Sequence, residues 1–166
     1  MRRWIRVVAI VPQFHANAWG IPYAALMAGS NVVMPDRFLQ PEPIAQILAV
    51  EKPTFAAAVP TIWQGLLSHL DAHPQDITHL RDVVVGGSAA PPSMMHAFEE
   101  RHGVRILHAW GMTETSPLGS VARPPAGATG DEQWRYRYTQ GRFPASVQAR
   151  LVGDDGNVVP NDGEQT

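Results

Sequence analysis

The sequence predicts an α/β fold in which a parallel β-sheet carries helices on both faces. Short apolar runs rich in β-branched residues alternate four times with segments whose apolar residues recur every three or four positions. Continuous apolar runs, as opposed to alternating ones, are typical of parallel strands buried on both faces. The chain has 166 residues, of which 45% are hydrophobic, and this is enough for one buried core.

Each element follows from a local signal. Residues 7–11 form a β-branched run that Pro12 closes, so we expect a strand. Trp19, Tyr23, Leu26 and Met27 then recur at helical spacing, which predicts a helix ending at Gly29. The same signals predict strands at 31–35, 54–59, 83–85 and 104–107 and helices at 41–48, 62–70 and 91–101.

The character of the chain changes after Pro117. Residues 119–137 are rich in glycine, proline and polar side chains, which predicts a long loop. Further on, 147–152 and 157–159 read as the two strands of a hairpin turned at Asp154-Asp155-Gly156. We therefore divide the chain into an α/β region at 1–118, a long loop at 119–145 and a truncated hairpin region at 146–166.

Composition excludes several classes of function. With 15 acidic and 13 basic side chains the net charge is −2, which disfavours a nucleic-acid partner. The absence of cysteine excludes disulfides and thiolate metal sites, and a cytoplasmic location fits. No apolar stretch reaches the ~20 residues of a membrane span. Charged residues make up 17%, below the ~25% of an average domain, so we expect part of the surface to be covered by another layer.

Three segments that follow predicted strands stand out as candidate ligand loops, because ligands of parallel α/β sheets bind at the carboxyl ends of the strands. They are Pro12-Gln13-Phe14-His15, Gly86-Gly87-Ser88-Ala89-Ala90-Pro91 and His108-Ala109-Trp110-Gly111-Met112-Thr113-Glu114-Thr115. The second also imitates the nucleophile elbow of hydrolases around Ser88. The acids Glu99 and Glu100, however, lie too near the histidines in sequence to come from separate strand-end loops, and no histidine follows Asp131.

Together and in this order, the three segments resemble the adenylate-forming superfamily, and specifically the fatty-acyl and related acid–CoA ligases. The resemblance implies the second parallel-sheet subdomain of the ligase's N-terminal domain plus the start of its small β-barrel. It also implies a two-step reaction with ATP, Mg²⁺ and coenzyme A: a carboxylic acid, expected to be a fatty acid, forms an acyl adenylate, and coenzyme A then displaces AMP.

The resemblance also implies roles for individual residues. Glu114 matches the magnesium carboxylate and Thr113 the hydroxyl that binds phosphate, which makes these two the catalytic candidates. Gly111 lies where the carboxyl group of the acid binds, and Trp110 stands where the family usually has a tyrosine against adenine. The remaining nucleotide contacts fall on Gly87, Ser88, Ala89, Ala90, His108, Ala109 and Met112, and the remaining acid contacts on His15 and Trp19.

Several family elements have no counterpart in the sequence. There is no phosphate loop ending in Pro-Lys-Gly before His15, and Lys52, the only lysine, is far from the motifs. We therefore expect the chain to be inactive alone, either as a central piece of a full ligase or as a non-catalytic nucleotide- or acyl-binding remnant. An adenylation domain that loads a carrier protein is a further alternative. Exposed sheet edges predict self-association.

Overall fold

A computed structural model describes residues 5–160 and contains one six-stranded sheet in the order β2-β1-β3-β4-β5-β6. The first five strands are parallel and β6 runs antiparallel to β5, so the predicted α/β class with a parallel sheet is confirmed. The strands are β1 (Arg6–Ala9), β2 (Asn31–Val33), β3 (Phe55–Ala58), β4 (Asp82–Val85), β5 (Arg105–Gly111) and β6 (Leu118–Val121).

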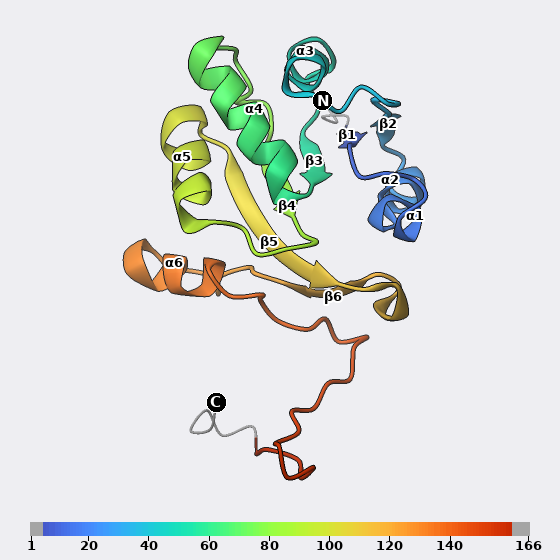
Figure 1. Ribbon diagram of the computed structural model, residues 1–166, viewed down its shortest axis with the longest axis vertical. Coiled ribbons are helices and arrows are strands. Elements are labelled where there is room, and N and C mark those ends of the chain that lie inside the picture. Colours follow the sequence, from blue (N-terminus) through green and yellow to red (C-terminus); the bar gives the residue numbers. More distant parts are fainter. Residues whose placement is uncertain (1–4, 161–166) are drawn as a thin grey trace.

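Three helices cover one face of the sheet and enclose the main core (Figure 1). Ala56 and Ala58 of β3 face this core, where the Trp63 indole N–H donates to the Ala58 carbonyl at 3.2 Å and the ring meets Phe98 edge-on at 5.9 Å. Burial of these large side chains supplies most of the driving force for folding. The helices are α3 (Pro41–Glu51), α4 (Pro60–Ala72) and α5 (Pro92–His102).

Within residues 5–160, the opposite face carries only α1 (Ala16–Trp19) and α2 (Ile21–Met27), beside β1 and β2 (Figure 1). The expected single helix from Trp19 to Gly29 is wrong at its start: all four α1 residues have φ between 45° and 55°, a left-handed turn, and α2 begins after Gly20. Left-handed backbone costs roughly 1–2 kcal/mol per non-glycine residue, so tertiary contacts must hold this turn. Helices on both faces are nevertheless confirmed, with coverage of this second face incomplete.

The region after β4 differs from the prediction in two ways. β5 continues to Gly111, so His108–Gly111 belong to a strand and not to a loop. The expected loop over 119–137 is also wrong, because it contains most of β6 and the helix α6 (Gly130–Arg137). Arg137 is fully buried and pairs with Glu99 of α5, which anchors α6 against the main core.

Beyond Arg142, whose backbone pairs with Val121, the chain leads away from the sheet (Figure 1). The predicted turn at 154–156 is present: Val152 and Val158 form an antiparallel bridge, and the Gly153 amide donates to the Asn157 carbonyl at 2.9 Å. A β-barrel starting here stays a prediction, and 161–166 lie outside the described residues. Within 5–160, no helix has the length and apolar character needed to cross a bilayer.

Candidate active site

A cavity of about 650 Å³ lies on the sheet face that α3, α4 and α5 leave free, and it reaches the carboxyl ends of β4 and β5. Its floor consists of apolar side chains that project from the same face of neighbouring strands, a consequence of the two-residue period of a strand. Ala57 and Ala109 add to the depth of the cavity, because their side chains are single methyl groups. The floor residues are Phe55, Ala57, Val84, Leu107 and Ala109.

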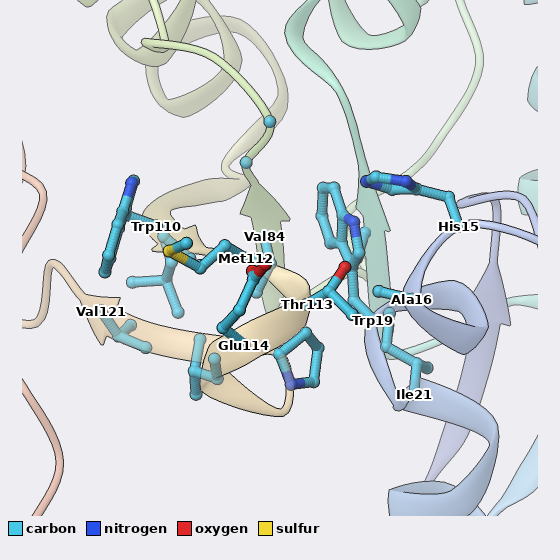
Figure 2. A pocket seen from close by; sticks show the side chains of 18 of the residues that line it. His15, Ala16, Trp19, Ile21, Val84, Trp110, Met112, Thr113, Glu114 and Val121 are labelled. Carbon is cyan, nitrogen blue, oxygen red and sulfur yellow. The ribbon is translucent and has the colours of Figure 1, made fainter. Parts of the chain in front are cut away.

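All three ligand segments predicted from the sequence contribute to this cavity. His15 lines it from the first segment, Gly87 from the second, and residues 109–114 from the third, while Trp19 lines it from α1. Figure 2 shows Thr113 and Glu114 between Trp110 on one side and Trp19 and His15 on the other. The hydroxyl and the carboxylate therefore share one cleft with the Gly86-Gly87 bend.

A short 3-10 turn, η1 (Thr113–Thr115), presents these two polar side chains. The Thr115 hydroxyl holds the turn: it accepts from the Met112 amide at 3.0 Å and donates to the Pro117 carbonyl at 2.5 Å. The Met112 amide also donates to that same carbonyl at 3.0 Å. Because Thr115 satisfies the backbone, the side chains of Thr113 and Glu114 remain available to a ligand.

Gly111 is required by the backbone of this turn. A β-carbon at position 111 would lie 1.9 Å from the Pro117 carbonyl oxygen, so no other residue fits without moving the turn. The resemblance implied a ligand role for this glycine, as the position where the carboxyl group of the acid binds, whereas the structure shows a requirement of the backbone itself. Gly119 has a similar role toward Trp110, since a β-carbon there would lie 2.4 Å from the indole ring.

Trp19 closes the cavity against the glycine bend. A β-carbon at Gly86 would lie 3.2 Å from the Trp19 ring and 3.1 Å from the Ala109 carbonyl oxygen, so the bare backbone at 86 makes room for the indole. This contact fixes the left-handed α1 turn on the sheet. Tyr23 and Met27, which share the helical spacing of Trp19 in the sequence, are exposed and do not line the cavity.

Four of the predicted nucleotide contacts do not line the cavity. Ser88 and Ala89 are exposed on the bend after β4, whereas Ala90 is buried and its amide donates to His108 Nε2 at 3.4 Å. His108 is 2% exposed, and this burial lowers the pKa of its imidazole below the usual value. Through this hydrogen bond, His108 on β5 links that strand to the segment that follows the Gly86-Gly87 bend, and it does so outside the cavity.

Sequence reasoning missed the floor of the cavity and the wall that β6 contributes. The floor could have been found, because residues two apart on a strand share a face. The β6 wall could not, because a segment rich in glycine and proline gave no strand signal. The lining residues missed in this way are Phe55, Ala57, Val84, Leu107, Leu118, Val121 and Arg123.

The sequence profile described as "AMP-binding enzyme" matches residues 2–165. The chain belongs to the AMP-binding enzyme family. This assignment confirms the resemblance to adenylate-forming acid–CoA ligases. Each of the segments 12–15, 86–91 and 108–115 contributes lining residues to the cavity.

Relatives within the AMP-binding enzyme family are acid–CoA ligases. The chain is 47% identical over 161 residues to a 3-methylmercaptopropionyl-CoA ligase of Ruegeria pomeroyi, covering 95% of this chain and 30% of that protein. It is 41% identical over 160 residues to a medium-chain-fatty-acid–CoA ligase of Ectopseudomonas oleovorans, covering 95% and 29%. The chain thus spans about 30% of the length of the curated relatives it matches.

Solved structures share the fold. A benzoate CoA ligase from Burkholderia xenovorans superposes with a TM-score of 0.79 at 24% identity, over 99% of this chain and 32% of that one. A long-chain-fatty-acid–CoA ligase from Archaeoglobus fulgidus gives 0.77 at 23% identity, over 93% and 32%. At these identities the comparison establishes the arrangement of strands and helices.

Proposed function

We propose that this chain forms the acid- and adenylate-binding part of an ATP-dependent acid–CoA ligase whose substrate is a fatty acid. The observation that carries the proposal is one cavity with a polar end at Thr113 and Glu114 and a floor of apolar side chains. Such a cavity suits an acyl adenylate, which joins an apolar chain to a charged phosphate. The family and the names of the relatives support it.

The polar end fits the charge that develops during adenylation. In this proposal the Thr113 hydroxyl donates to an oxygen of the α-phosphate, where negative charge gathers as the carboxylate attacks. The Glu114 carboxylate is an oxygen ligand of the kind Mg²⁺ prefers. Mg²⁺ is commonly held by one or two carboxylates together with substrate phosphates, so one carboxylate suffices here, although 5–160 contain no cluster of three metal-ligating side chains. When bound, the ion would neutralise phosphate charge.

The apolar end orients the acid and excludes water. Leu107, Ala109 and Val84 offer no hydrogen bonds to a polar group, so an alkyl chain gains by displacing water from this floor. Adenine would lie between the Trp110 ring and the backbone of the Gly86-Gly87 bend. The acid's carboxyl group would then meet the phosphate near Gly111, between the two halves of the ligand.

We further propose that the chain binds acid and adenylate without completing the reaction alone. Its single lysine, Lys52, ends α3 and precedes β3, at the sheet edge opposite the carboxyl ends that the cavity reaches. No other primary amine side chain is available to the phosphates. The proposal includes a cytoplasmic location, where ATP and coenzyme A are abundant. Self-association also stays a prediction, with β2 as an edge strand.

Calorimetric titration of the purified chain with octanoyl-sulfamoyl-adenosine, a stable analogue of an acyl adenylate, tests the proposal. We expect binding that weakens at least tenfold in a Thr113→Val, Glu114→Ala double variant. Glu132→Ala, which removes an exposed acid on α6, is the matched control and should bind normally. Octanoyl-dependent pyrophosphate exchange should be absent.

Other outcomes would contradict the proposal in distinct ways. Binding of adenosine as tight as that of the acyl analogue would favour a nucleotide-binding remnant, since the apolar floor would then contribute nothing. Pyrophosphate exchange by the chain alone would refute both the remnant and the proposal that the chain does not complete the reaction by itself. Failure to bind any adenylate would reject the ligase function for this cavity.

A further inference from the structure

Arg123 stands out among the residues that line the cavity. Only two lining side chains carry a full charge, Glu114 and Arg123, and the floor between them is apolar. The guanidinium of Arg123 makes no hydrogen bond or salt bridge with any residue in 5–160. An unpaired cation in the wall of a cavity with an apolar floor is a candidate ligand contact.

The strand register places Arg123 and Glu114 at opposite ends of the floor. Gly111, at the end of β5, precedes the Thr113–Thr115 turn that carries Glu114. The Ala122 amide donates to the His108 carbonyl at 2.8 Å, so the antiparallel register places the next residue, Arg123, opposite Leu107. Leu107 and Gly111 are four residues apart on β5, which corresponds to about 13 Å along the strand. Arg123 therefore lies about that far from the polar end.

We propose that Arg123 recognises a second anionic group at the far end of the acid, so that the cavity favours acids with a terminal carboxylate or sulfonate. This inference rests on the proposed function, in which the reacting carboxyl group lies near Gly111. An acyl chain that starts there and follows the floor past Ala109 reaches Arg123 with its other end.

The chemistry of the side chain suits this role. A guanidinium presents paired N–H donors in a planar fork that matches two oxygens of a carboxylate or sulfonate. Leu107 and Val121 flank this end of the cavity and lower the local polarity, which strengthens the ion pair relative to bulk water. Because Arg123 itself is exposed, solvent screens part of the attraction, and we expect a moderate preference.

Two acyl-adenylate analogues test the proposal, because in both the reacting carboxyl group is already joined to the nucleotide. Octanoyl-sulfamoyl-adenosine ends in a methyl group, and suberoyl-sulfamoyl-adenosine ends in a carboxylate. In calorimetric titrations, Arg123→Leu should weaken binding of the suberoyl analogue about tenfold and that of the octanoyl analogue less than twofold. Arg123→Lys should lose only part of the preference.

Arg142→Leu is the matched control. Its backbone pairs with Val121, beside Arg123, but its guanidinium lies 5.8 Å from the Tyr136 ring centre and does not line the cavity. It should leave both affinities unchanged. Arg123→Gln, which keeps the length and polarity of the side chain, repeats the test should the leucine variant fold poorly.

The outcomes separate this inference from the proposed function. Equal losses for both analogues in Arg123→Leu and Arg123→Gln, no loss for either, or an equal loss in Arg142→Leu would overturn the role of Arg123 alone. Absence of binding of both analogues to the unaltered chain would overturn the proposed function, and this inference with it.

Discussion

Replacing Gly111 with alanine places a methyl group where the Pro117 carbonyl now lies. The new β-carbon would be 1.9 Å from the carbonyl oxygen and 3.2 Å from the Gly119 nitrogen. Both are backbone atoms, so no side-chain rotation relieves the contact, and the turn that carries Thr113 and Glu114 must retreat by about 1 Å. Overpacking of this kind costs roughly 1–3 kcal/mol. A displacement of about 1 Å can also cost a reaction on the order of a hundredfold.

For Gly111→Ala we expect urea denaturation to show about 2 kcal/mol less stability, and calorimetry to show at least tenfold weaker binding of octanoyl-sulfamoyl-adenosine. Gly127→Ala is the control: its φ of 88° makes alanine costly by about 1 kcal/mol, but the added methyl group meets no atom within 4 Å and lies away from the cavity. That control should lose stability and keep its affinity. Wild-type stability and affinity in Gly111→Ala would refute the argument.

Three other substitutions test separate features. Trp110→Ala should weaken binding of the adenylate analogue about tenfold by removing the aromatic face, whereas Trp110→Phe should retain most of it, as calorimetry can show. Glu99→Ala leaves the buried Arg137 unpaired and should lower the free energy of unfolding by about 3 kcal/mol in urea, against less than about 0.5 for the exposed neighbour in Glu100→Ala. Because burial lowers the pKa of His108, the unfolded chain takes up a proton first as the pH falls below about 6.5, so stability should fall there; His108→Gln should reduce that loss between pH 7.5 and 5.5.

The position of the site could be predicted because the sheet is parallel. Apolar runs and helical spacing identified the five parallel strands, and the carboxyl ends of such strands meet at one edge. That reasoning predicts that His15, Gly87 and Glu114 lie close together, and all three line one cavity. The shape of the cavity could not be derived in the same way, because it depends on which sheet face the helices leave open.

Two local structures escaped the sequence analysis for different reasons. α6 had a readable signal, with Asp131 and Glu132 in its first turn and Arg135 and Arg137 in its last, a charge order that favours helices. The segment around α6 is rich in glycine and proline, and this composition led to the prediction of a loop. The left-handed α1 turn had none, because it exists through the contact of Trp19 with a glycine bend far along the chain.

The division of the sheet into a helix-covered face and an open one separates the residues of the main core from those that shape the cavity. Ala56, Val83 and Ile106 point into the core beneath α3, α4 and α5, whereas Ala57 and Ala109 face the cavity. Ala57 and Ala109 are themselves buried, and Ala57 packs in a second cluster with Val11 and Ala18. A larger side chain at either alanine would narrow the cavity without entering the core beneath α3, α4 and α5. The shape of the cavity can therefore change through substitutions that lie outside the main core of the fold.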